Sequence, residues 1–149
     1  MASGHFQIER CNATQLDLRL SGAIDEETVL GCEREARVGS TLAERASLHI
    51  LWDLREVASY TFDARIVLVR LQRYLAPKAA RTVYVAAEAA ARSLALWAAH
   101  MGGEGRMCIT AELGPARAWL ARESEPMTGR YLIEGVRATA RPSKDRAAG

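Results

Sequence analysis

Cysteine is scarce in this sequence of 149 residues, and its three cysteines do not form a recognisable site. Cys11, Cys32 and Cys108 lie far apart and show no CxxC spacing. An odd number of widely separated cysteines predicts neither a disulfide framework nor a zinc motif. We therefore expect three reduced thiols. A catalytic cysteine is the minor alternative, because the sequence has no local cysteine-hydrolase signature.

Charge of one sign and long hydrophobic runs are lacking as well. The formal net charge is +2, which is too small to predict binding to nucleic acid or to an anionic membrane. The longest apolar stretch, residues 86–101, is interrupted by charged residues and is too short to span a bilayer. Residues 5–10 alternate and carry charge, whereas a secretory signal is continuously apolar. We therefore expect a cytoplasmic protein that does not insert into membranes.

Motifs for catalysis and for metal or cofactor binding are missing too. His5, His49 and His100 have no partner residues at metal-ligand spacing, and there is no GxSxG motif. The glycine-rich segment 102–105 follows a predicted helix and precedes a predicted strand, which is the reverse of a phosphate-binding loop. We expect no metal, no cofactor and no enzymatic activity.

The composition is that of an ordinary globular domain. Hydrophobic residues make up 49% of the sequence and charged residues 26%. A chain of this length forms one domain and buries enough surface to fold without a metal or a disulfide.

Strand and helix patterns alternate along most of the chain. The predicted strands cover residues 6–8, 16–20, 48–54, 81–87 and 106–110. The predicted helices cover residues 25–39, 61–75 and 89–101, and a last helix opens at Gly114 and Pro115. This order, β-β-α-β-α-β-α-β-α, predicts an α/β fold with a mixed, mostly parallel five-stranded sheet and four helices.

Individual residues predict details of the helices. Asp25 and Thr61 are suited to be N-caps of the first two helices. Trp97 and Trp119 lie on the apolar stripes of the last two helices, so we expect both to be largely buried. Arg65, like the other arginines of the second helix, is interpreted as part of a solvated helix face.

The helical and strand patterns fade after Glu123. We predict a domain over residues 1–123 and a C-terminal extension over residues 124–149. Within the extension, residues 131–133 can form an additional edge strand. From Arg137 onward the sequence is rich in basic and small residues and predicts a mobile tail.

Three local motifs, taken in order, point to a known family. Residues 16–25 read LDLRLSGAID, residues 51–57 read LWDLREV and residues 114–120 read GPARAWL. Over about residues 6–121 the chain resembles SpoIIAA-like (STAS-type) domains, which are related to bacterial anti-sigma-factor antagonists. The resemblance implies a helix-flanked sheet and a non-enzymatic regulatory module that binds another protein in a signalling pathway.

The same resemblance implies where the partner binds. In anti-sigma-factor antagonists, the loop after the central strand carries a D-S-S-G motif with a serine that a partner kinase phosphorylates. With the motifs aligned on Asp53, the acceptor position falls on Asp63, and no glycine follows it. The resemblance therefore implies a module without the usual phospho-acceptor serine. Its candidate partner-binding residues are Ser59, Tyr60, Thr61 and Asp63.

Alternatives to this interpretation stay open. Ser59 or Thr61 can be simple helix caps, and Asp63 a first-turn charge. The partner can be an anti-sigma-factor-like kinase, another signalling protein or a second copy of the chain. SpoIIAA-like domains also resemble Sec14-type lipid-binding folds, and the alanines of the third helix leave room for a ligand. The alternative function is therefore a carrier of a small apolar ligand or lipid.

Deleting residues 137–149 should leave the melting temperature nearly unchanged, because this segment lacks apolar periodicity. Thermal unfolding of the full chain and of a chain that ends at Val136, followed by circular dichroism, checks this prediction. A large drop in melting temperature would show that the tail packs on the domain.

Overall fold

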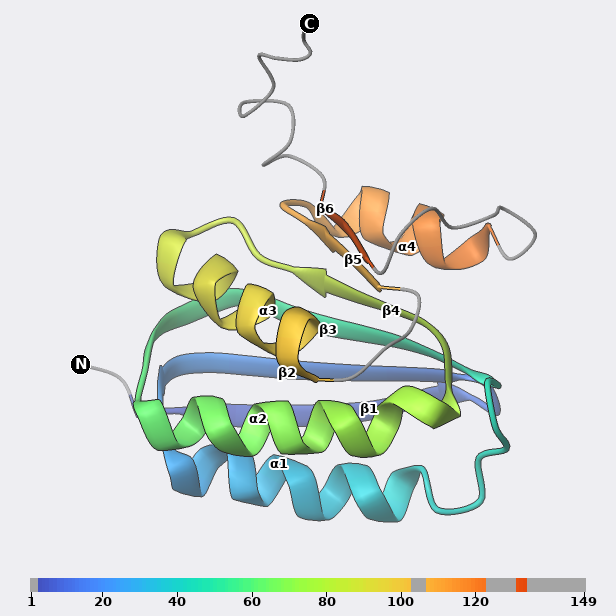
Figure 1. The fold of residues 1–149 in the computed structure, drawn as a ribbon, viewed down its shortest axis with the longest axis horizontal. Coiled ribbons are helices and arrows are strands. Elements are labelled where there is room, and N and C mark those ends of the chain that lie inside the picture. The colour runs from blue at the N-terminus through green and yellow to red at the C-terminus, as the bar shows by residue number, and fades with distance from the viewer. Residues whose placement is uncertain (1–2, 103–106, 123–130, 134–149) are drawn as a thin grey trace, which may run out of the picture.

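A six-stranded β-sheet forms the centre of the molecule, and its strands lie side by side in chain order (Figure 1). The structure is a computed structural model that describes residues 3–102, 107–122 and 131–133. The strands are β1 (His5–Asn12), β2 (Gln15–Ile24), β3 (Leu48–Tyr60), β4 (Ala79–Val85), β5 (Met107–Thr110) and β6 (Tyr131–Ile133). The helices are α1 (Glu26–Gly39), α2 (Phe62–Leu75), α3 (Ala89–Met101) and α4 (Leu113–Ala121), and the 3-10 turn η1 (Ala76–Lys78) follows α2.

The pairing of the strands confirms the predicted mixed, mostly parallel sheet. β1 and β2 form an antiparallel pair, and the later pairs, from β2–β3 to β5–β6, are parallel. The sequence predicted five strands and indicated a further edge strand at residues 131–133. This segment pairs with β5 as β6, so the sheet has six strands.

β3 is longer than its apolar pattern predicted. The run of residues 48–54 predicts a strand that ends near Leu54, but β3 continues to Tyr60. It does so because β2 also continues, and the two strands stay paired up to Ile24 and Tyr60. A shift of register between Arg19 and Ser21 of β2 accommodates one extra residue on β3. Asp53 consequently lies in the middle of β3.

Helices cover both faces of the sheet (Figure 1). α1, α2 and α3 pack over one face, where Trp52 and Tyr84 belong to the larger hydrophobic core. α4 packs on the opposite face against Leu51, Val83 and Cys108. The central strands are therefore buried on both faces, which explains the continuous apolar run at residues 48–54.

Side chains at the helix ends explain where the helices begin and end. The side chains of Asp25 and Thr61 each accept a hydrogen bond from the backbone amide three residues later, at 2.9 and 3.1 Å. Both predicted N-caps are confirmed. α3 ends at Gly102, where a Cβ atom would collide with Gln72 of α2. α4 begins at Leu113, one residue earlier than its sequence predicted.

The two helix tryptophans differ, and the prediction that both are buried is wrong for one of them. Trp119 of α4 is 3% exposed, as expected, whereas Trp97 of α3 is 39% exposed. The buried side of α3 consists of Leu94 and the alanines Ala91, Ala95, Ala98 and Ala99. A close helix contact made by alanines leaves no room for an indole, so Trp97 stays at the surface.

A buried carboxylate joins α1 to α2. Glu33, which is 7% exposed, accepts two hydrogen bonds from the Arg70 guanidinium (2.6 and 2.8 Å) and one from Arg37 (3.3 Å). The bonds from Arg70, together with the bond from Arg37 and both positive charges, outweigh the effect of burial. They hold the pKa of Glu33 below its usual value.

None of the helices in the described residues is long and apolar enough to cross a membrane. The predicted boundary between domain and extension near residue 123 stays a prediction. The predicted mobile tail from Arg137 lies outside the described residues.

Truncating Trp119 to alanine should lower the free energy of unfolding by roughly 3–5 kcal/mol, because it leaves a cavity beneath α4. Trp97→Ala removes the same side chain from the surface and should cost only about 1 kcal/mol, mostly as a lost cation–π contact. Urea melts of the two variants check this difference. Equal costs would contradict the different burial of the two indoles.

Glu33→Gln should lower the free energy of unfolding by roughly 1–3 kcal/mol at pH 7, because it weakens charge-assisted hydrogen bonds between α1 and α2. The folded-state pKa of Glu33 is depressed. The stabilisation is therefore complete above the unfolded pKa of about 4.3 and is lost as the pH falls through the folded value. Urea melts between neutral and acid pH should show wild type and variant converging. Glu35→Gln, at an exposed position of the same helix, is the control.

Candidate functional site

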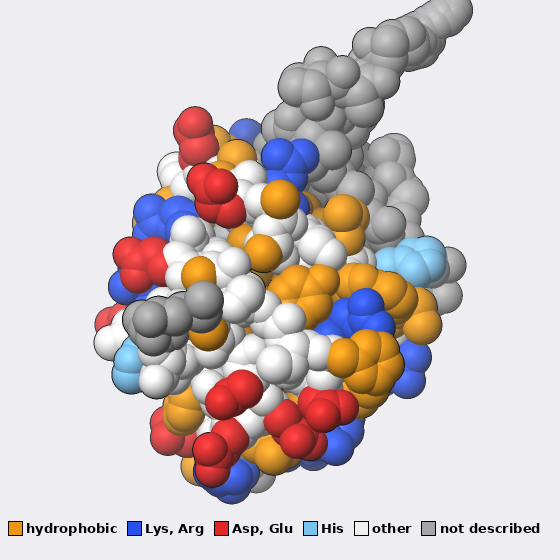
Figure 2. Space-filling model, turned by 90° about the vertical axis from the view of Figure 1, so that its left-hand side faces the viewer, with side chains coloured by type: hydrophobic (Ala, Val, Ile, Leu, Met, Phe, Trp, Pro, Cys, Tyr) orange, Lys and Arg blue, Asp and Glu red, His pale blue; other side chains and the backbone are white. Residues whose placement is uncertain are grey.

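The predicted binding residues lie where β3 passes into α2. Ser59 and Tyr60 end β3, Thr61 caps α2 and Asp63 lies in the first turn of α2. The Thr61 amide donates a hydrogen bond to the Ile24 carbonyl (3.0 Å), so the junction lies beside the end of β2. The N-termini of α1 and α2 therefore come together at one end of the molecule, which faces the viewer in Figure 2.

The four predicted residues differ in what their side chains do. The Thr61 hydroxyl caps α2, so the alternative interpretation as a helix cap is correct for this residue. Asp63 is exposed, and Ser59 is half-buried. The Tyr60 hydroxyl lies 2.6 Å from the Ser93 hydroxyl of α3, at hydrogen-bond distance. The structure thus brings the junction and α3 together, and a binding role for the four residues stays a prediction.

An arginine contacts two aromatic rings beside this junction. The guanidinium of Arg65 lies 3.8 Å from the centre of the Trp97 ring and 4.6 Å from the centre of the Phe62 ring. Each contact of this kind is worth roughly 0.5–1 kcal/mol at an exposed site. The sequence pattern predicts a solvated Arg65 and a buried Trp97, and therefore does not predict this stack. The i, i+3 spacing of Phe62 and Arg65 on α2 is the local sequence feature that indicates part of this stack, the contact between these two residues.

Exposed hydrophobic residues gather around the stack. Of the six large hydrophobic residues that the structure shows as exposed, four lie on α2 or α3: Phe62, Ile66, Trp97 and Met101. We call this set, together with Arg65, the α2–α3 face. Figure 2 shows hydrophobic side chains on either side of a basic one at the right of the view. A contiguous exposed apolar patch on a soluble domain commonly marks an interaction site.

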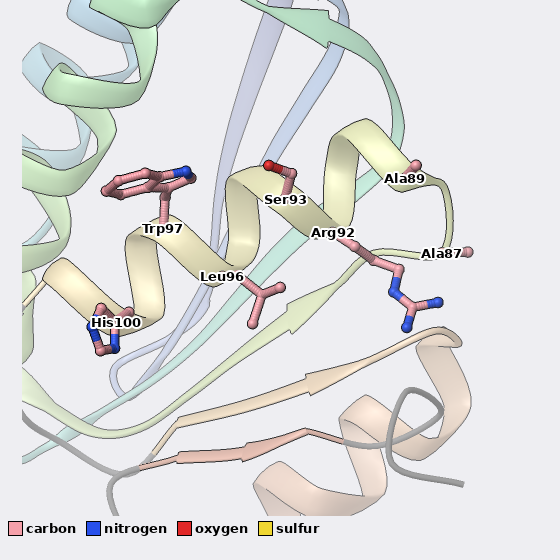
Figure 3. Close-up of a pocket in the computed structure, with 7 residues that line it drawn as sticks. All are labelled: Ala87, Ala89, Arg92, Ser93, Leu96, Trp97 and His100. Carbon is pink, nitrogen blue, oxygen red and sulfur yellow. The ribbon is translucent and has the colours of Figure 1, made fainter. Parts of the chain in front are cut away.

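A groove of about 700 Å³ runs along α3 (Figure 3). Its described lining residues are Ala87, Ala89, Arg92, Ser93, Leu96, Trp97 and His100. Except for Ala87, they project from successive turns of α3. The lining is mostly apolar, with Arg92 and His100 as its basic groups. Because Ser93 contacts Tyr60 and Trp97 contacts Arg65, the groove is continuous with the junction and with the α2–α3 face.

A cluster of charged residues lies on the same face of the sheet as α4, which is the face that α1 does not cover. The Asp53 carboxylate accepts hydrogen bonds from the Arg55 guanidinium at 2.9 and 2.8 Å, and Arg19 lies within 3.5 Å. Burial raises the pKa of Asp53, but the bonds from Arg55 and the charges of both arginines outweigh burial and lower it. Arg19 also pairs with Glu56 (3.7 Å). The cluster therefore neutralises its own charges and offers no free carboxylate pair for acid–base chemistry.

The described residues contain no group of three or more His, Cys, Asp or Glu side chains placed to hold a metal ion. The buried Cys32 thiol has a pKa that burial, with smaller contributions from Glu35 and Glu33, raises to about 12. A thiol of this kind is not ionised near neutral pH and is a poor nucleophile.

Comparison with known proteins finds similarity at the level of the fold. No known protein-family profile matches the chain, and no curated protein matches it. Among solved structures, it is similar to an uncharacterised protein of the DUF3478 family with a SpoIIAA-like fold from Shewanella loihica PV-4. The superposition has a TM-score of 0.61 at 16% sequence identity and covers 81% of this chain and 99% of the other. The chain therefore has a SpoIIAA-like fold, as its motifs predicted.

The contact between Tyr60 and Ser93 should contribute roughly 0.5–1.5 kcal/mol of coupling energy, the usual net value of a hydrogen bond. A double-mutant cycle with Tyr60→Phe and Ser93→Ala, measured by urea unfolding, gives this energy directly. Additive effects of the two substitutions would show that the hydroxyl groups do not bind each other in solution.

Proposed function

We propose that this SpoIIAA-like domain is a non-enzymatic regulatory module that binds another protein through the α2–α3 face and the adjoining junction of residues 59–63. The observation that carries the proposal is the exposed stack of Phe62, Arg65 and Trp97. Large aromatic residues and arginine dominate the binding energy of protein interfaces.

The packing of the stack supports an interface more than an incidental exposure. The Arg65 guanidinium contacts both rings, so the three side chains support one another before a partner arrives. Tyr60 and Ser93 join the adjacent strand end to α3. Binding to an ordered surface costs less conformational entropy than binding to one that must be arranged.

The charge of Asp63 bears on the regulation that we propose. An exposed carboxylate in the first turn of a helix stabilises that helix by roughly 0.3–1 kcal/mol. By the family resemblance, Asp63 stands where the related antagonists carry a serine that gains charge by phosphorylation. A kinase cannot phosphorylate a serine at this position, so we propose that the regulation of the module depends on its partner.

A non-enzymatic role agrees with the state of the titratable groups that we have described. The two most buried carboxylates, Glu33 and Asp53, are both held by arginines, and Thr61 is occupied as a cap. Groups that are fully engaged in structure are poor candidates for general acid–base catalysis.

The groove along α3 favours a second candidate function, a carrier of a small apolar ligand. Its volume of about 700 Å³ falls in the range of ligand sites, and Leu96 and Trp97 provide apolar walls. Native mass spectrometry of the purified chain tests this candidate. A bound molecule that is lost on Leu96→Asp substitution would favour the carrier.

Photo-crosslinking tests the interaction module. A benzophenone side chain at position 62, introduced in cells that express the chain natively, should form a discrete adduct with a second protein. The same probe at Leu42, which is 93% exposed but lies away from the α2–α3 face, is the matched control. Adding Trp97→Ser should reduce the adduct at position 62 about tenfold or more, as for an interface hot spot. Equal adducts at positions 62 and 42, or none at position 62, would argue against the module.

A further inference from the structure

The segment that forms the α2–α3 face is strongly biased in charge. From Phe62 to Met101 the sequence has six arginines and lysines but only two acidic residues, Asp63 and Glu88. Acidic residues are common elsewhere in the chain, so this bias is local. Both acidic residues lie where α2 and α3 begin, so the later turns of the two helices carry basic but no acidic side chains.

Four basic side chains of this segment lie on or beside the α2–α3 face: Arg65, Arg73, Arg92 and His100. Within the described residues, none of the four forms an ion pair with a carboxylate. Arg65 stacks on aromatic rings, and Arg73 donates to the Met101 carbonyl at 2.8 Å. Arg70 behaves differently, because Glu33 of α1 neutralises it. The charge of the face is therefore available to a binding partner.

The apolar residues of the face have helical spacing on both helices. Phe62 and Ile66 are four residues apart on α2, and Trp97 and Met101 are four residues apart on α3. α2 and α3 lie beside each other, as the contacts of Arg65 with Trp97 and of Arg73 with Met101 show. Two neighbouring apolar ridges, with cations along them, form a surface onto which an amphipathic helix can lay its apolar side.

We propose that the partner presents an acidic amphipathic helix to this face. Its apolar side chains would pack on the two ridges and on Leu96 in the groove. Its flanking carboxylates would pair with Arg65 and Arg92. This inference rests on the proposed function, because it names the chemistry of the protein that the module binds. α2 has 14 residues, or about 21 Å of helix, which sets the length of segment that the face can hold.

Charge also decides between a protein segment and an anionic membrane. Asp25, Glu26, Glu27 and Asp63 are exposed where α1 and α2 begin, and Figure 2 shows acidic side chains gathered along the lower rim of that end. A flat anionic bilayer that reached the α2–α3 face would also approach this acidic rim and be repelled by it. A single helix is narrow enough to lie along α2 and α3 without covering the rim, so the protein segment is favoured.

Selection from a library of helical peptides tests the proposal directly, because it asks which flanking charges the face prefers. The library would display peptides of about 18 residues, long enough to cover α2, with fixed apolar positions and random flanking positions. The purified full chain would be the bait. Peptides that also bind the double variant Phe62→Ser, Trp97→Ser would be removed. The flanks of the selected peptides should be enriched in Asp and Glu. A selected peptide should lose about tenfold or more in affinity when Arg65 or Arg92 is replaced by Glu.

Matched controls separate this result from a general effect of charge. Arg34→Glu changes an exposed arginine on α1, away from the face, and should leave the affinity within about twofold. Vesicles of equal parts phosphatidylcholine and phosphatidylglycerol, and dodecanoate below its micelle concentration, would be assayed in parallel by Trp97 fluorescence. Trp97 suits this purpose, because Trp52 and Trp119 are buried.

Several outcomes would overturn the proposal. Selected flanks that are basic or uncharged, or affinity that survives Arg65→Glu and Arg92→Glu, would refute the acidic helix. A library that yields no binder, or binding to the vesicles or to dodecanoate alone, would refute it as well. The crosslink at position 62 is independent of the charge of the partner. If the crosslink forms but the selected peptides are not acidic, the proposed interaction module is supported and only the acidic helix is rejected.

Discussion

The close packing of α3 through alanines is the constraint on which the surface of this domain depends. Ala91, Ala95, Ala98 and Ala99 are fully buried, and Gly102 ends the helix where any larger residue would collide with Gln72 of α2. A helix that lies this close to its neighbours cannot bury a large ring at the same contact. Trp97 is therefore exposed and stacks on Arg65 of α2. The groove along α3 and the α2–α3 face both result from this arrangement.

In the part of the chain that the structure describes, charged side chains are paired with one another in some regions of the domain and lack an ion-pair partner in others. On the face of the sheet opposite α1, Asp53, Arg55 and Arg19 neutralise one another, and Glu33 and Arg70 do the same between α1 and α2. Among the described residues, two groups of charges without an ion pair stand out: the acidic residues where α1 and α2 begin and the cations along the α2–α3 face. Paired charges mainly maintain the fold, whereas unpaired charges beside apolar side chains can select a partner.

The similarity to a solved SpoIIAA-like structure concerns the fold, and at 16% identity it carries no residue-level role. The functional argument therefore depends on this chain's own side chains. Phe62, Arg65 and Trp97 come from two helices and meet beside the junction that the family motifs indicated. Agreement between the motif position and an independent physical feature is what makes this end of the molecule the best candidate for a binding surface.

Local sequence signals determined most of the architecture. Asp25 and Thr61 could be predicted as N-caps because the side chain of a cap bonds to an amide only three residues later. α3 also has the bounds that its composition predicted. The alternation of strands and helices was sufficient to give the order of the elements and the antiparallel start of the sheet. Tertiary structure decided the rest. β3 extends to Tyr60 because β2 remains paired with it, and Asp53 is consequently a mid-strand residue. Trp97 and Trp119 occupy similar apolar stripes, yet one is exposed and the other buried, because burial depends on which neighbouring helix or strand fills the space beside each ring.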